Sequence, residues 1–115
     1  MKTITKSGNE PSSYTATINI GQNAKENDAL FSSSKSEDMW FHLDKNPSAH
    51  VYLHIDGNVT KSDEKRLWFE CCNLVRLHSK CNMEAKVVML ERKYLSKSPD
   101  CSSGQVIMKK KGTIV

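Results

Sequence analysis

The stretch Asp38-Met-Trp-Phe-His42, followed by Ser48-Ala-His50-Val-Tyr-Leu53, decides the fold of this 115-residue chain. Both halves are short apolar runs typical of β-strands. The residues between them, Asn46-Pro47-Ser48, are typical of a turn, because proline fixes φ while Asn and Ser bond their own backbone. If the two strands are neighbours, a polar and aromatic cluster forms near one end of the sheet. The residues expected in that cluster are Asp38, Trp40, His42, Ser48 and His50.

This cluster allows three interpretations. Aromatic and imidazole rings can stack on a nucleic-acid base, while an acid or a hydroxyl bonds the base edge or the ribose. Alternatively, Trp40 belongs to the core and both histidines are structural, since tryptophan is highly buried on average. A catalytic interpretation with Ser48 as nucleophile lacks a second acid within reach and an oxyanion-forming glycine cluster. We therefore expect no enzyme.

Alternation along the first run predicts which side chains are accessible. Met39, Phe41 and Leu43 share one side of the strand and are the better core candidates. Trp40 and His42 share the other side, with the preceding acid on the same face. Trp40 is therefore predicted to be at least partly accessible, as a stacking residue must be.

The remaining pattern predicts an α+β fold, with a single, mostly antiparallel sheet, one short and one long helix, and the helices on one side. Residues 1–13 are expected to be an N-terminal arm or edge strand, and residues 14–115 one domain. Capping patterns at Asn23 and Thr60 predict helix starts, and the long helix should run from Ser62 to about Lys80. Strands are expected at 14–20, 39–43, 50–55, 86–91, 106–108 and 113–115, with a turn at 56–58 and a hairpin turn at 109–112.

The positive charge is concentrated near the C-terminal end. Residues 1–83 hold ten basic and ten acidic residues, whereas residues 84–115 hold seven basic and three acidic ones, which accounts for the net charge of +4. A localised basic face predicts a polyanion partner, although a solvated lysine cluster is the alternative. Lys25, beside Asn27 at a helix start, is a phosphate candidate. The other basic candidates are Arg92, Lys93, Lys109, Lys110 and Lys111.

Composition indicates neither a membrane protein nor a cofactor site. No apolar run approaches the roughly 20 residues that span a bilayer, and no secretory apolar region follows Met1, so we expect a cytoplasmic protein. The four cysteines form no Cys-x-x-Cys pair, and His78 with Cys81 lacks a second ligand pair. Reduced structural thiols are therefore expected, with no metal and no other cofactor.

The central motifs resemble those of the NFACT-R domain. Its pattern Asp-x-Trp-Phe-His, then Ser-x-His-Val, is present here at residues 38–51, and Gly21-Gln-Asn-Ala-Lys-Glu-Asn-Asp28 resembles its upstream segment. The two closing strands of that family resemble residues 104–108 and 111–115, so the resemblance covers roughly residues 14–115. Gln22 replaces a usual basic residue, and Met108 replaces a frequent Tyr.

The resemblance implies a non-catalytic RNA-binding module of the NFACT proteins, which act in ribosome-associated quality control. Their Asp-x-Trp pair is the hallmark of the domain, which implies RNA contacts for Asp38 and Trp40. A stand-alone form similar to the coiled-coil domain-containing 25 proteins is expected, without their C-terminal helix. Transfer RNA or ribosomal RNA, the large ribosomal subunit and DNA are the partners to consider. The alternative is a protein-interaction module that docks on a translation or ribosome partner through Phe69 and the Trp40 region.

Overall fold

The computed structural model describes residues 1–9, 11, 13–79, 84–97 and 102–115. The helices are α1 (Ala24–Ser33) and α2 (Lys61–His78), with a 3₁₀ turn η1 at Arg92–Tyr94. The strands are β1 (Lys2–Gly8), β2 (Ser13–Gly21), β3 (Met39–Leu43), β4 (His50–Asn58), β5 (Val87–Glu91), β6 (Leu95–Ser96), β7 (Ile107–Met108) and β8 (Thr113–Ile114). Neither helix is long and apolar enough to cross a membrane in the part of the chain that the structure describes.

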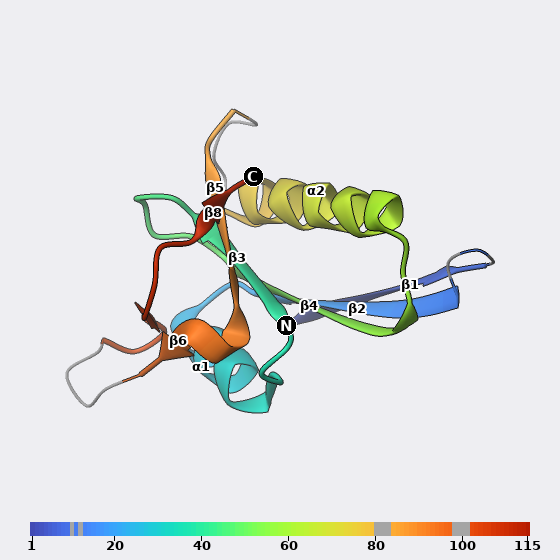
Figure 1. The fold of residues 1–115 in the computed structure, drawn as a ribbon. Coiled ribbons are helices and arrows are strands. Elements are labelled where there is room, and N and C mark those ends of the chain that lie inside the picture. Colours follow the sequence, from blue (N-terminus) through green and yellow to red (C-terminus); the bar gives the residue numbers. More distant parts are fainter. Residues whose placement is uncertain (10, 12, 80–83, 98–101) are drawn as a thin grey trace.

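The strands form a six-stranded sheet of order β1-β2-β4-β3-β5-β8 and a small second sheet of β6 and β7 (Figure 1). Every pairing is antiparallel, which confirms the α+β fold. β1 pairs with β2 along its whole length, from Lys2 opposite Ile20 to Gly8 opposite Tyr14, and is one edge of the large sheet. The domain boundary expected after residue 13 stays a prediction.

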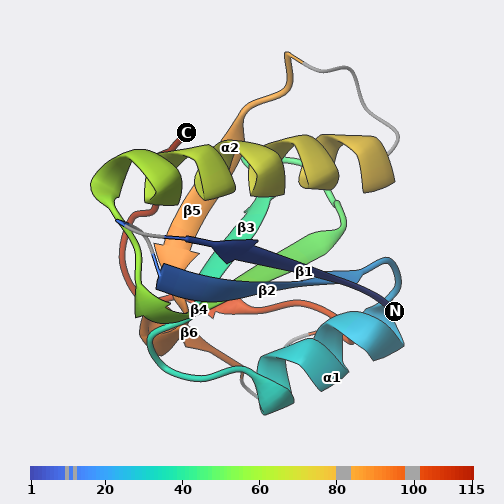
Figure 2. The same cartoon turned by 90° about the vertical axis from the view of Figure 1, so that its right-hand side faces the viewer.

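The two helices cover opposite faces of the large sheet (Figure 2), so the expectation of helices on one side is wrong. Alternation on the strands supplies an apolar layer on each face. Phe41 and Val51 pack with α2 in the larger cluster, whereas Trp40 and Tyr52 pack with Leu30 of α1 in the other. The β6–β7 ribbon lies beside α1 and contributes Leu95 to this second cluster. Because both faces of the sheet carry apolar side chains, a helix has to cover each face.

Local signals set the helix starts as expected. The Asn23 side chain accepts a hydrogen bond from the Glu26 N–H at 2.9 Å, and the Thr60 hydroxyl accepts one from the Asp63 N–H at 3.2 Å. These caps satisfy backbone donors that have no partner inside the helix. Both predicted helices are confirmed, with boundaries shifted by a few residues.

Two of the predicted turns are wrong. Residues 56–58 continue β4, where they pair with the start of β2, and Gly57 has a φ of 95°, which glycine adopts without strain. The expected hairpin at 109–112 does not form, because β7 pairs with β6 while β8 pairs with β5. The segment 109–112 instead crosses from the small sheet to the large one. The three lysines therefore lie on a crossing segment and not on a hairpin tip.

Candidate nucleic-acid interface

The register of β3 and β4 separates the five clustered residues into two groups. Trp40 lies opposite Tyr52, so the same antiparallel register places His42 opposite His50 and Asp38 opposite His54. Trp40, His42 and His50 do converge, with ring centroids 4.7–5.7 Å apart. Asp38 lies two residues before Trp40, at the other end of β3. The expected meeting of all five residues at one sheet end is therefore only partly correct.

Trp40 is on the predicted face but is only 3% exposed, so its predicted accessibility is wrong. Leu30 from α1 and Leu95 from β6 belong to the same buried cluster and cover this part of the sheet. The indole Nε1–H donates to His50 Nδ1 at 3.2 Å. Its ring is stacked on the imidazole of His42 at an interplanar angle of 21°. Trp40 thus supports two histidines from within the core.

The two histidines have opposite tautomers. His50 Nδ1 accepts the indole N–H, so the ring proton of neutral His50 is on Nε2. His42 Nδ1 lies 2.6 Å from the Leu43 carbonyl oxygen, which can only accept, so His42 carries its proton on Nδ1. Burial lowers the pKa of His42, and burial together with nearby His42 lowers the pKa of His50 to about 3. Both rings are neutral at physiological pH.

Ser48 holds the loop between β3 and β4. Its hydroxyl accepts from the Leu43 N–H at 3.0 Å and donates to the Ala49 carbonyl at 2.8 Å. The hydroxyl proton is therefore directed at a carbonyl and not at a histidine. A Ser–His pair of the kind that activates a nucleophile is not formed by Ser48 and the two neighbouring histidines.

Asp38 fixes the entry into β3. Its carboxylate accepts from the Lys35 N–H at 2.9 Å and pairs with His54 Nδ1 at 2.5 Å, and the residue is only 5% exposed. The hydrogen bond that His54 donates to the Asp38 carboxylate raises the pKa of His54. His54 was missed in the sequence, although alternation from His50 through Tyr52 indicates it. Glu37, Asp38 and His54 place potential metal-ligand atoms within 4.8 Å, but Asp38 and His54 already bond each other.

A groove of about 920 Å³ is lined by both histidines, of which His42 is half-buried and His50 shows only 4% of its surface. Trp40, His42, His50 and Val88 contribute from the sheet, and the loop after β3 forms one wall with Lys45 at its exposed edge. The start of α1 and the segment 102–108 complete the lining. Polar lining residues from these parts include Ser48, Asn23, Asn27, Ser102, Ser103 and Gln105, and apolar ones Leu43, Pro47, Val106 and Met108.

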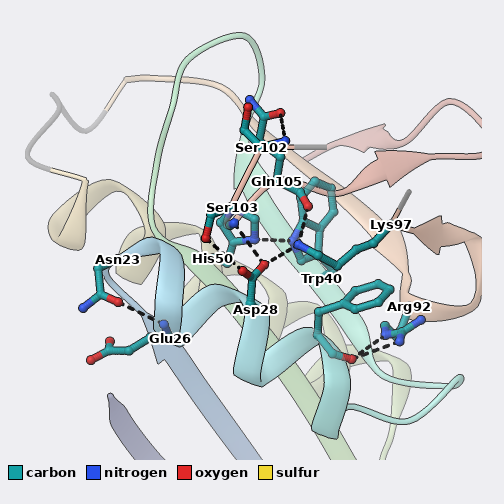
Figure 3. Close-up of polar contacts among 12 residues, drawn as sticks. Asn23, Glu26, Asp28, Trp40, His50, Arg92, Lys97, Ser102, Ser103 and Gln105 are labelled. Atoms are coloured by element: carbon teal, nitrogen blue, oxygen red, sulfur yellow. Dashed lines mark hydrogen bonds and ion pairs between the residues drawn. The ribbon is translucent and has the colours of Figure 1, made fainter. Parts of the chain in front are cut away.

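At the α1 side of the groove, Asp28 connects α1 to the segment 102–108 (Figure 3). Its carboxylate accepts from the Gly104 N–H at 2.9 Å and the Ser103 hydroxyl at 3.1 Å, and it forms an ion pair with Lys97. The hydrogen bond from Lys97 is the main reason that the pKa of Asp28 is lowered. Gly104 has a φ of 83°, and a Cβ there would lie 2.8 Å from the Ala24 Cα. Only glycine permits this close approach.

The two candidates at the start of α1 differ in exposure. Lys25 is exposed, as a phosphate contact requires. Asn27 is buried, and its Oδ1 has no hydrogen-bond partner. A Cβ at Gly21 would lie 2.2 Å from this oxygen, so Asn27 packs directly against the backbone at the end of β2. The Asn27 side chain therefore has a packing role at the helix start.

A second basic feature, here called the Tyr94 surface, consists of Tyr94, Lys93, Lys109, Lys110 and Lys111. The ammonium groups of Lys110 and Lys93 lie 4.4 Å and 5.3 Å from the centroid of the Tyr94 ring. The Lys109 N–H donates to the Tyr94 carbonyl at 2.7 Å, which joins the crossing segment to η1. Tyr94 was missed as a site candidate in the sequence, although it directly follows two basic residues.

Arg92 lies next to this surface but is engaged within the protein. Its guanidinium donates to the Phe31 carbonyl at 2.9 Å and to the Ser34 hydroxyl at 2.7 Å, and it lies 3.7 Å from the Phe31 ring centroid. These contacts give hydrogen-bond donors to the acceptors at the C-terminal end of α1. An RNA contact by Arg92 stays a prediction.

The family model described as NFACT protein RNA binding domain matches residues 5–110. The chain belongs to this family. Coiled-coil domain-containing protein 25 of Mus musculus is 37% identical over 98 residues, covering 82% of this chain and 47% of that protein. The Bos taurus protein of the same name is 36% identical over 107 residues, with coverages of 90% and 50%. The chain thus spans about half the length of these relatives.

A solved structure supports the same fold for the NFACT-R domain. The C-terminal part of the fibronectin/fibrinogen-binding protein from Streptococcus suis superimposes with a TM-score of 0.71 at 28% identity. The match covers 87% of this chain and 39% of that one. Family membership confirms the resemblance and supports a general RNA-binding role for the domain.

The thiols that the structure describes belong to the core of the NFACT-R domain. Cys71 and Cys72 are buried and free, and burial raises the pKa of both, to about 11 for Cys72. Cys81 and Cys101, and hence the His78–Cys81 spacing, lie outside the described residues.

Proposed function

We propose that this NFACT-R domain binds transfer RNA or ribosomal RNA in ribosome-associated quality control in the cytoplasm, without catalysing a reaction. The observation that carries the proposal is the Tyr94 surface, an aromatic ring flanked by lysines in a family of RNA-binding domains. Lysines neutralise phosphates without reading sequence, and an aromatic ring stacks on any unpaired base. Contact with the large ribosomal subunit is part of this proposal, and DNA is a second polyanion to test.

The contacts of Lys110 suggest how the surface would accept RNA. Its ammonium lies over the Tyr94 ring, where a base would have to stack. A base that stacks there displaces Lys110, which is on a flexible four-carbon stem and can move to an adjacent phosphate. Lys93 can do the same but also pairs with Glu91 at 3.2 Å, so it contributes less free positive charge.

A second candidate function has its own supporting observation. Phe69 and Leu77 on α2 are 60% and 65% exposed and lie eight residues apart, on one side of the helix. Two exposed apolar side chains flanking the polar Asn73 suit docking on a protein of the translation machinery. The Trp40 region, which is buried, is no longer part of this alternative.

Salt dependence separates the two functions. We expect micromolar binding of a stem-loop RNA, with a logarithmic salt slope of roughly −2 to −4 if three to five phosphates are neutralised. Fluorescence anisotropy over a series of KCl concentrations measures this slope. A flat response, or no RNA binding at low salt, would contradict the RNA-binding proposal and favour docking through α2.

A further inference from the structure

We propose that the groove above His42 and His50 receives one unpaired base of the bound RNA, and that the two imidazoles bond the edge of that base. This inference rests on the proposed RNA-binding function and adds a base-binding site to its phosphate contacts. Three observations carry it: the arrangement of ring protons, the size and lining of the groove, and the rigid support of both rings.

The two imidazoles present one donor and one acceptor. His50 has its proton on Nε2, since Nδ1 accepts from Trp40, and His42 has a free acceptor on Nε2, since Nδ1 donates to Leu43. Their ring centroids are 4.7 Å apart. The Watson–Crick edge of every base carries an acceptor next to a donor, such as N1 and N6 of adenine. The histidine pair, whose ring planes lie at 89°, therefore offers the kinds of donor and acceptor that this edge requires, and only a base that is not paired can use them.

The groove has the size and chemistry of a small-ligand site. Its volume of about 920 Å³ lies within the range of roughly 300–1,000 Å³ that is typical of such sites. Val88, Val106 and Met108 supply apolar lining for the faces of a base, and the two histidines supply directional polar groups. Because burial keeps both imidazoles neutral, the donor–acceptor arrangement does not change over the physiological pH range.

The surrounding contacts hold this arrangement in place. Trp40 fixes the tautomer of His50 through its N–H and supports the His42 ring by stacking, so Trp40 is a positioning residue. Asp28 fixes the opposite wall through Ser103 and Gly104. Preorganised polar groups lose little entropy on binding, which favours recognition of a single flexible nucleotide.

The test compares two stem-loop RNAs that differ in one bulged 2-aminopurine. Binding of the bulged RNA should change 2-aminopurine emission, and His42→Phe should weaken its affinity by about fivefold while leaving the fully paired RNA unaffected. His54→Asn is the control, because it removes a histidine on the same sheet face outside the groove and keeps a side-chain N–H for the Asp38 carboxylate. Both variants are checked by thermal melting.

The outcomes separate this inference from the proposed function. If both RNAs bind with a steep salt slope but His42→Phe and the 2-aminopurine signal show no effect, the groove does not receive a base and RNA binding stands. If neither RNA binds at low salt, the proposed function itself is wrong, and the groove proposal falls with it. Should His42→Phe fail to fold, adenosine monophosphate is titrated into the wild-type domain. Shifts of the His42 and His50 ring signals in NMR then support the proposal, and their absence overturns it.

Discussion

The two faces of the six-stranded sheet solve the same packing problem with different residues. Under α2, the buried layer consists of apolar side chains and thiols, such as Leu67, Cys71 and Val75. On the opposite face, Trp40 packs in the core while its N–H bonds a histidine. One face is therefore built for stability alone, whereas the other combines stability with polar groups that meet a groove. The difference indicates where recognition can evolve without loss of the core.

The largest expected effect is the loss of Trp40. Trp40→Ala should lower the free energy of unfolding by about 3–5 kcal/mol, a cost similar to the roughly 2–5 kcal/mol of Leu67→Ala on the α2 face. Urea denaturation followed by circular dichroism measures both. Trp40→Phe is the control, because it keeps a ring against His42 but removes the N–H that bonds His50. If Trp40→Ala left stability unchanged while Leu67→Ala did not, the polar face would not be a second core.

A smaller effect is expected for the crossing segment. Replacing Lys109, Lys110 and Lys111 together by Ala should reduce the RNA salt slope by about two to three units. All three are exposed and outside the buried clusters, so stability should change by only about 0.5 kcal/mol.

The matched control for this variant removes three basic residues of α2 instead. Replacing Lys61, Lys65 and Arg66 of α2 by Ala removes the same charge from exposed positions. This control should leave the slope nearly unchanged. An equal loss of slope in both variants would mean that RNA responds to net charge and not to the Tyr94 surface.

The smallest effect concerns pH, where histidines on one face act in opposite directions. His54 has a raised pKa, so its stabilising effect is complete below about pH 6.5 and is lost as pH rises through its folded-state pKa. His50 has its pKa lowered to about 3, so its unfolded form binds the proton first, and stability falls as pH drops below about 6.5. NMR titration of the ring signals should show His54 titrating above its ordinary value and His50 not titrating near neutrality. If His50 titrated near neutrality and His54 below its ordinary value, the two ends of β4 would not differ in the way proposed.

Local signals in the sequence predicted the elements well. Caps at Asn23 and Thr60 and the alternation of β2 and β3 depend on neighbouring residues, so spacing was sufficient. Alternation also placed Trp40 on the correct face, but its burial depends on Leu30 and Leu95, which are distant in sequence. Whether a face is covered cannot be inferred from its own strand.

The errors at the C-terminal end have a related cause. Strands β7 and β8 have two residues each, and such short segments are paired by tertiary context and not by a turn signal. Residues 97–106 separate β7 from its partner β6, and residues 92–112 separate β8 from its partner β5. The groove could not be predicted for the same reason. One of its walls depends on the bond from the Gly104 N–H to Asp28, and these two residues are 76 positions apart in the sequence.

The two buried thiols of α2 can report how often the core opens. Alkylating reagents attack the thiolate, and burial makes that form scarce at Cys71 and Cys72 in the folded protein. Modification at these two positions must therefore wait until α2 separates from the sheet. The rate of iodoacetamide labelling there, followed by mass spectrometry, reports how often this happens, with no added probe.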